Sequence, residues 1–241
     1  MSLTEKACVS EFIQLVDTHD QDKCIEYINK HNLYNAIINK HIALNILQFV
    51  CMRNLSHVAM ALIDRKCDLT HQNVSGFTAM MYASSYGSGN VVAYIIDKST
   101  NIMTLNTLYG VSEMMFICNN EDVENVIKMI DRGYDIYYKN NNNESLLTSA
   151  IYHELDKVVM KLIDIDTNFI DEFKTLYNKP KLKKDAFYYK IIIYCIDKRD
   201  SYKKIIIDMM NDASPTNALY QSFRNTYAIQ LVDVICDFII L

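Results

Sequence analysis

The sequence predicts an all-α solenoid of about seven stacked helix pairs, with short hairpin fingers and divergent caps. Three observations lead to this prediction. A four-residue motif recurs about every 33 residues, and the segments that end in it carry apolar residues at helical spacing. The chain also holds only 5 glycines and 2 prolines in 241 residues. This scarcity disfavours all-β folds and Rossmann-type enzymes, because both need glycine at tight turns.

The recurring motif ends in an aspartate. It reads Ala-Leu-Ile-Asp, Tyr-Ile-Ile-Asp, Lys-Met-Ile-Asp and Lys-Leu-Ile-Asp, and its last residues are Asp64, Asp97, Asp131 and Asp164. These aspartates are 33, 34 and 33 residues apart. Self-similarity at such a period is typical of stacked repeat architectures. We interpret the row of carboxylates as a solvated edge of the repeats and assign no chemistry to it.

Each repeat is expected to consist of two short amphipathic helices. In the clearest copy they are 78–85 and 91–97, joined by a turn with Gly87 and Gly89. Thr78 is placed to cap the first helix, and Ser112 and Ser145 occupy the same position in later copies. Helices this short are marginal alone, so stacking on neighbours must bury their apolar faces.

At this point the sequence resembles the ankyrin-repeat family. Residues 76–84, Gly-Phe-Thr-Ala-Met-Met-Tyr-Ala-Ser, are similar to its motif G-x-T-P-L-H-x-A-A. Residues 87–97 are similar to G-H-x-x-V-V-x-L-L-L-E, and 133–135 to G-A-D. The resemblance covers roughly residues 45–168 well and the remainder weakly. It implies a protein-binding scaffold whose partner lies on the concave surface.

Two departures from the family motif affect the expected geometry. The motif's histidine is replaced, so the finger turns are expected to be less rigidly tied; its substitutes are Gln48, Met81, Met115 and Thr148. Only Gly133 retains the glycine that ends the second helix in a left-handed conformation. The residues in its place elsewhere should adopt that conformation at some backbone cost; they are Lys66, Ser99 and Asp166.

The chain is predicted to divide into three parts. Residues 1–40 form an N-terminal capping pair with helices at 9–16 and 22–28, and residues 41–168 form four repeats. Residues 169–241 hold an insertion at 171–185, a worn repeat whose second helix is 203–211, and a last pair at 218–224 and 227–239. The aliphatic runs 191–193 and 205–207 are expected to fit one buried helix face.

The sequence predicts no enzyme, metal site or cofactor. No HExxH motif, no His–Cys pairing at zinc spacing and no glycine-rich phosphate loop occurs. The seven cysteines lack a regular framework and suggest reduced thiols. With no secretion signal and no apolar run of about 18 residues, we expect a cytoplasmic protein without a membrane partner. The net charge of -5 makes nucleic acid an improbable partner.

The resemblance implies a partner-binding surface made of finger tips and the exposed ends of the first helices. The fingers contribute Gln72, Val74, Ser75, Phe77, Leu105, Leu108, Val111 and Lys139, with Asn141 and Asn142 beside the last. The helices contribute Ser85, Tyr86, Asn119, Asn120, Tyr152 and His153. For Phe77 and Tyr86 the alternative is that the first packs on a neighbouring finger and the second closes a turn. The same alternatives, interface or packing, hold for Tyr134, Tyr137 and Tyr138.

The partner itself is an unidentified protein. Degenerate repeats in a chain rich in Ile, Asn, Lys and Tyr are also similar to ankyrin-repeat proteins of large DNA viruses, which act on host proteins in the host cytoplasm. Two alternatives stay open. One is a self-assembling structural protein, and the other is a nucleic-acid or phospholipid binder that uses the lysine-rich loop 179–184. The run 140–143 is interpreted as a solvated hairpin tip.

Overall fold

The computed structural model describes residues 3–179, 182–214, 216–223, 231–234 and 236. Their contacts divide the chain into two compact units, 1–149 and 150–241. The described residues are helical apart from short connections and one two-stranded hairpin, formed by β1 (Ile37–Asn39) and β2 (Leu44–Asn45). The predicted all-α class is therefore confirmed. The division into 1–40, 41–168 and 169–241 stays a prediction.

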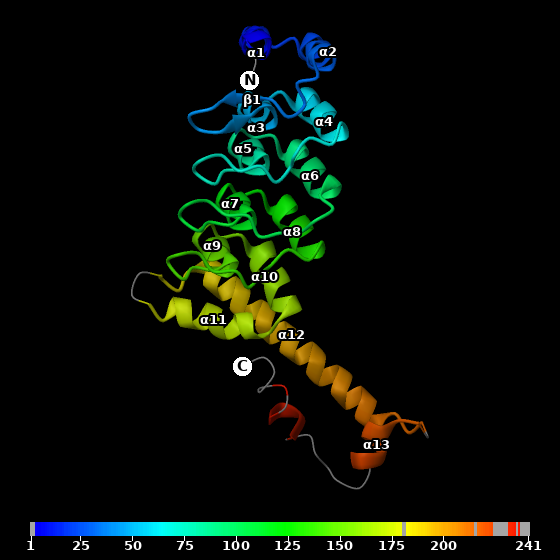
Figure 1. Cartoon of the computed structure of the whole chain (residues 1–241). Coiled ribbons are helices and arrows are strands. Elements are labelled where there is room, and N and C mark those ends of the chain that lie inside the picture. The colour runs from blue at the N-terminus through cyan, green and yellow to red at the C-terminus, as the bar shows by residue number, and fades with distance from the viewer. Residues whose placement is uncertain (1–2, 180–181, 215, 224–230, 235, 237–241) are drawn as a thin grey trace. The chain divides into compact units, whose positions relative to one another are not determined.

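The first unit is a series of stacked helix pairs, each joined to the next by a finger-like loop (Figure 1). The pairs are α1 (Leu3–Val16) with α2 (Gln21–His31), α3 (Ile46–Met52) with α4 (Ser56–Asp64), α5 (Ala79–Ser85) with α6 (Gly89–Lys98), and α7 (Glu113–Asn119) with α8 (Val123–Asp131). The boundary between the units falls within α9 (Leu146–Tyr152).

The second unit includes four further helices with defined bounds among the described residues. They are α10 (Asp156–Ile165), α11 (Asn168–Tyr177), α12 (Ala186–Asn211) and α13 (Ala218–Phe223). Helix α10 contacts both α11 and α12, and α12 also contacts α13. One face of α11 is buried, including Phe169, Phe173 and Tyr177, and the ring of Phe173 stacks on that of Tyr188 at 5.7 Å between centroids.

Side-chain caps fix where the short first helices begin. The Thr78 hydroxyl accepts a hydrogen bond from the Met81 amide, Ser112 from Met115, and Ser145 from Thr148. The predicted caps are thus confirmed. Helix α3 begins with a capping box, in which Asn45 and Gln48 each accept from the other's backbone amide. Each cap satisfies an amide that the first helical turn leaves without a partner.

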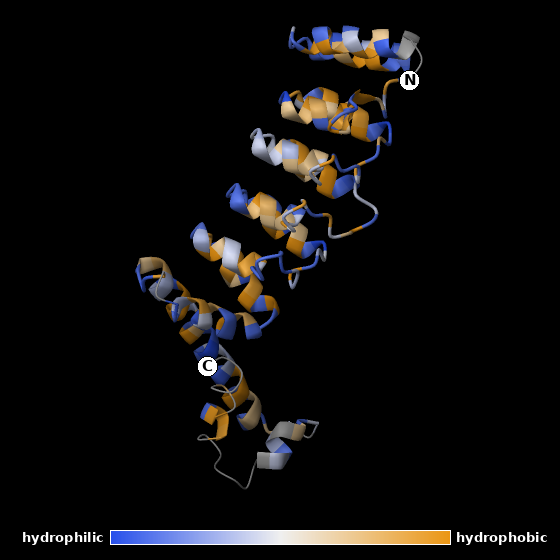
Figure 2. Cartoon of the chain, turned by 60° about the vertical axis from the view of Figure 1, so that its left-hand side comes forward, coloured by the Kyte–Doolittle hydropathy of each residue, from blue (hydrophilic) through white to orange (hydrophobic). Residues whose placement is uncertain are grey.

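The core lies between the two helices of each pair and between successive pairs. First helices are buried on almost every side, and Ala83 in α5 has no exposed surface. Second helices bury one face only, such as Val91, Val92, Ile95 and Ile96 in α6. Figure 2 accordingly shows apolar residues gathered on the helices, while most loops are hydrophilic. Burial of these faces offsets the low intrinsic stability of helices of 7 to 10 residues.

The structure differs from the expectation for residues 169–211. Residues 171–177 of the expected insertion at 171–185 belong to helix α11, and residues 203–211 are the end of the 26-residue helix α12 rather than a separate second helix. The reason is that residues 186–211 contain neither Gly nor Pro, so nothing interrupts the helix. Helix α13 agrees with the first helix of the last expected pair, 218–224. Most of the second helix of that pair, 227–239, lies outside the described residues.

The expected helix ends are correct only in part. Gly133 and Lys66 adopt positive φ angles of 84° and 59°. Ser99 and Asp166 do not: their φ angles are -67° and -144°, and their backbones are extended. The chain leaves α6 and α10 without a left-handed residue, so the backbone cost expected at these two positions is absent.

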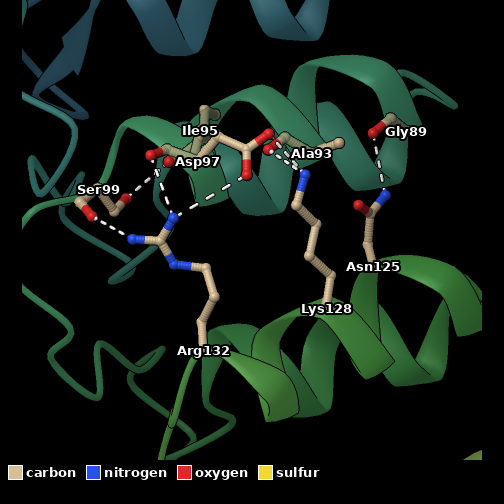
Figure 3. A network of polar contacts seen from close by, with 8 residues as sticks. All are labelled: Gly89, Ala93, Ile95, Asp97, Ser99, Asn125, Lys128 and Arg132. Carbon is tan, nitrogen blue, oxygen red and sulfur yellow. Dashed lines mark hydrogen bonds and ion pairs between the residues drawn. The ribbon is translucent and has the colours of Figure 1, made fainter.

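Polar contacts at the ends of the second helices join successive repeats (Figure 3). The Lys128 ammonium lies 2.6 Å from the Asp97 carboxylate, and the Arg132 guanidinium donates to the carbonyl oxygens of Asp97 and Ser99. One repeat earlier, Tyr94 donates to Asp64 at 2.6 Å. The hydrogen bond from Tyr94, with that from Lys98, lowers the pKa of Asp64. The aspartates are exposed, as expected of a solvated edge, but these two also link neighbouring repeats.

A carboxyl group is buried between the third and fourth helix pairs. Glu113 is the first residue of α7, and only 6% of its surface is exposed. The Thr78 hydroxyl, from the preceding pair, lies 2.5 Å from Glu113 Oε1. Burial raises the pKa of Glu113 to about 7, a rise that the hydrogen bond from Thr78 opposes only in part. In α5 the same position is held by the apolar residue Ala79.

Candidate protein-binding face

Hydrogen bonds and a glycine with positive φ fix the turn at the tip of a finger in the first unit. In the finger at 72–77, Asn73 Oδ1 accepts hydrogen bonds from the amides of Ser75 and Phe77, both at 2.9 Å. Gly76 closes the turn with a φ angle of 79°. A Cβ atom there would lie 2.6 Å from the carbonyl oxygen of Asn106 in the next finger, so only glycine fits without a shift. Backbone conformation and close finger packing thus both require Gly76.

Two later fingers repeat this turn with other residues. Thr107 replaces Asn73 and accepts from the Val111 amide, while Gly110 has a φ angle of 75°. In the next finger Asn140 Oδ1 accepts from the amides of Asn142 and Glu144, and Asn143 takes the left-handed position with a φ angle of 61°. The asparagine run therefore forms the expected hairpin tip, and two of its members have specific structural roles.

Backbone hydrogen bonds connect the tips directly. The Val74 amide donates to the Ile42 carbonyl at 3.0 Å, and the Leu108 amide donates to the Ser75 carbonyl at 3.1 Å. The Gln72 side chain bridges two fingers, since it donates to the carbonyls of Gly76 and Asn106. The expectation of loosely tied turns is therefore wrong for these fingers. Other side chains replace the motif histidine, and Gln48 itself donates to the carbonyls of His71 and Phe77.

Large apolar side chains stand exposed on the connected tips. The exposed fractions are 53% for Val74, 70% for Leu108 and 80% for Tyr109. Tyr109 was missed by sequence reasoning, although its position in the middle of a finger tip was a signal that could have found it. We call the tips 40–43, 72–77 and 105–111, together with the exposed ends of α5 and α7, the finger face. Its cations include Lys40, and its three tips contain no carboxylate.

The expected site residues at the helix ends are mostly exposed. Ser85, Asn119 and Asn120 are exposed, and Tyr86 is 48% exposed. Asn120 donates to the Ser84 hydroxyl of the preceding repeat, so its amide is held in place. The exposed residues Ser75, Lys139, Asn141 and Asn142 also lie at finger tips. In the second unit, Tyr152 is 60% exposed and His153 is half-buried.

Other expected site residues contribute mainly to packing between fingers. Phe77 is half-buried, and its ring lies 5.3 Å from that of Phe116 and 5.7 Å from that of Tyr82. Gln72, Leu105 and Val111 are likewise half-buried. Burial raises the pKa of Tyr82, whose hydroxyl accepts from Asn73. The contacts of Phe77 agree with the alternative of packing on a neighbour, whereas the exposure of Tyr86 leaves it accessible to a partner.

The three tyrosines of 134–138 and the lysines of the loop 179–184 differ in burial and in their contacts. Tyr134 is buried, Tyr137 is 59% exposed, and the Tyr138 hydroxyl donates to the Gly110 carbonyl. In the second unit, the lysine-rich loop has exposed side chains at Lys179, Lys183 and Lys184, and part of the loop lies outside the described residues. The Lys184 ammonium lies 5.2 Å from the centre of the Tyr188 ring.

The described residues offer no cluster typical of metal or catalytic chemistry. No three His, Cys, Asp or Glu side chains among them are grouped so that they could hold a metal ion. No described helix is long and apolar enough to cross a membrane. Burial raises the pKa of Cys51, Cys67 and Cys118, which disfavours the reactive thiolate form.

Comparison with known proteins agrees with this geometry. Residues 8–106 match the family model of ankyrin repeats in three copies. A search of curated proteins finds no match to the chain. The matched segment starts in α1 and so includes the N-terminal helix pair, which the sequence motifs indicated only weakly. The following pair α7–α8 continues the same architecture. Residues 8–106 are therefore similar to ankyrin repeats, and the fold is an all-α ankyrin-repeat solenoid.

Proposed function

We propose that the chain is a binding scaffold that holds a partner protein against the finger face. Ankyrin repeats generally mediate protein–protein interactions. The observation that carries the proposal is the exposure of Val74, Leu108 and Tyr109 on tips joined by backbone hydrogen bonds. Large apolar groups held in fixed positions at the surface mark interaction sites. Because the tips are already ordered, binding a partner costs little additional conformational entropy in the tips.

The chemistry of the finger face suggests the kind of contact it makes. The face combines apolar anchors at Leu108 and Tyr109 with exposed amides such as Asn120, as an interface with apolar and polar parts requires. We further propose that the partner is a host protein met in the host cytoplasm and that the chain is of viral origin. The degenerate repeats and the richness in Ile, Asn, Lys and Tyr support this part of the proposal.

Comparative capture from cytosol tests the proposal. The wild type, a finger variant with Leu108→Asp and Tyr109→Asp, and a control variant with Ile102→Asp would each be immobilised, and captured proteins identified by mass spectrometry. Ile102 is an exposed apolar residue that follows α6 and lies before the next tip, so it matches the chemistry of the change. A specific partner should be lost only in the finger variant. Affinity for the purified partner should then fall by about 2 kcal/mol or more, the size typical of interface hot spots.

Two results would contradict this function. If a captured protein binds the finger variant as tightly as the wild type, the finger face is not its site. If binding instead falls steeply with salt and is abolished by Lys183→Ala with Lys184→Ala, the lysine-rich loop carries an electrostatic function. Circular dichroism of each variant would show that it remains folded.

A further inference from the structure

The repeat continues beyond Asp164, the last of the four motif aspartates. Residues 194–197 read Tyr-Cys-Ile-Asp, and Asp197 follows Asp164 by 33 residues. The contacts repeat as well. The Tyr194 hydroxyl and the Lys198 ammonium both contact the Asp164 carboxylate, as Tyr94 and Lys98 contact Asp64. The first half of α12 is therefore the second helix of a further repeat in unbroken register.

In this repeat the apolar side chains beside the aspartate are exposed, whereas in the other repeats the corresponding isoleucine is buried. The isoleucine before each motif aspartate is buried in four repeats; its exposed fraction is 4% at Ile63, 0% at Ile96, 5% at Ile130 and 0% at Ile163. At Ile196 the fraction is 39%, and the neighbouring Ile193 and Tyr189 are 57% and 55% exposed. The Asp197 side chain makes no hydrogen bond or ion pair with another described residue. The side of α12 that corresponds to a repeat-stacking surface is thus uncovered among the described residues.

The outer surface of the N-terminal helix pair is polar along α2. On α2 every exposed side chain is polar or charged; they are Asp22, Lys23, Glu26, Asn29 and Lys30. Terminal repeats of solenoids need such a polar outer surface. Helix α12 lacks one, because Tyr189, Ile193 and Ile196 lie on one side of it at spacings of 4 and 3 residues. A copy that stacked α12 on α2 would place the apolar side chains of α12 against exposed polar ones, so pairing of like surfaces is favoured.

The charges on the same side of α12 favour an antiparallel arrangement. Asp197 and Asp200 are followed by Lys203 and Lys204, and the spacing continues to Ile207. Two copies of α12 that run in opposite directions about a point next to Asp200 place Asp197 of each copy near Lys203 and Lys204 of the other. The same arrangement places Ile193 opposite Ile207. Lys203 also pairs with Asp233 of its own chain, whereas the Lys204 side chain is exposed. The apolar residues and the charges on this side of α12 are therefore complementary to those of a second, antiparallel copy.

We propose that a second copy of the chain covers this side of α12, which we call the α12 stacking face and define by Tyr189, Ile193, Ile196, Asp197 and Lys204. The two α12 helices pair in antiparallel orientation about a two-fold axis. This contact extends the established surface between repeats across two molecules. The α12 stacking face shares no residue with the finger face, so separate variants test the two proposals.

Sedimentation equilibrium tests the proposal on the full chain. The wild type should change with concentration from the mass of one 28.0 kDa chain to that of two. Ile193→Glu with Ile196→Glu should weaken dimerisation at least about tenfold, because it buries charges without partners. The matched control is Tyr202→Glu with Ile205→Glu, two exposed residues on the opposite side of α12, and it should dimerise as the wild type does. Equal weakening by both variants would contradict the assignment to the stacking face.

A charge exchange tests the orientation. Asp197→Lys should weaken the dimer, and addition of Lys204→Asp should restore it, because the two positions face each other across an antiparallel contact. Asp197 and Lys204 both carry exposed side chains, so thermal melting of these variants by circular dichroism should stay close to that of the wild type. A wild type that remains monomeric up to about millimolar concentration, where even weak specific pairs associate, would overturn the proposal. Failure of the exchange to restore a dimer would overturn the antiparallel arrangement.

Discussion

Replacing Glu113 by glutamine should stabilise the folded chain at neutral and alkaline pH. The carboxyl is buried beside Thr78 and has a pKa of about 7, above its ordinary value of 4.5. Between these two pH values the folded chain keeps a proton that the unfolded chain releases. The free energy of unfolding therefore falls by about 1.4 kcal/mol for each pH unit in that window. Below pH 4.5 both states hold the proton, and above pH 7 neither does, so the slope disappears.

The total effect follows from the width of the window. A rise of about 2.5 pKa units corresponds to roughly 3 kcal/mol of stability that the wild type has at acidic pH and loses by pH 8. Glutamine stays neutral and still accepts a hydrogen bond from the Thr78 hydroxyl. The variant and the wild type should therefore have similar stability near pH 4, and Glu113→Gln should be more stable at pH 8 by up to that amount.

Urea denaturation followed by circular dichroism at pH 4, 6 and 8 measures this difference. The control is Glu124→Gln, the same change at an exposed position of α8, which should alter stability equally little at each pH. The reasoning would be refuted if the difference between Glu113→Gln and the wild type did not change with pH. It would also be refuted if the variant were the less stable protein at pH 8.

Three further tests, made with five substitutions, concern the packing of the repeats. Gly76→Ala should destabilise the chain by about 2 kcal/mol more than Gly87→Ala in urea unfolding. Both positions have a positive φ, but only at Gly76 would an added Cβ meet the backbone of a neighbouring finger. Equal losses of unfolding free energy would contradict the packing argument. Phe77→Ala should lower the unfolding free energy by about 2 kcal/mol and Tyr86→Ala by about 0.5 kcal/mol or less, and the reverse order in thermal melting would contradict their contacts. Ala83→Phe should cost about 1–3 kcal/mol or more, so unchanged melting would show that the site tolerates the extra volume.

The sequence predicted those features that depend on local chemistry. Thr78, Ser112 and Ser145 cap their helices as their position in the repeat indicated. The end of the array was predicted less well, because a helix without Gly or Pro crosses the boundary at which the next repeat would end. Asp197 was missed for this reason, and residues 203–211 were matched to a distant helix instead of being joined to 186–202.

The candidate site could be predicted only by position, since exposure depends on tertiary contacts. Val74 and Phe77 lie in the same finger, yet Val74 is exposed and Phe77 is held between Tyr82 and Phe116. Nothing in the local sequence distinguishes their environments. Similarly, the aliphatic run 191–193 was expected to fit a buried face, but only Ile191 is buried whereas Ile193 is 57% exposed. Ile205, in the second run, is also exposed.

The short reach of the contacts between repeats has a consequence for how the first unit folds. Tyr94 and Asp64 are 30 residues apart in sequence, and Asn125 and Gly89 are 36 apart. Every such contact closes a loop of similar length, so no step requires the meeting of distant chain segments. Folding can begin in any pair that forms a stable nucleus and spread to its neighbours, and chains of this kind fold fast for their size. In stopped-flow experiments, a change in one contact should therefore alter the folding rate only if its pair belongs to that nucleus, and otherwise should speed unfolding.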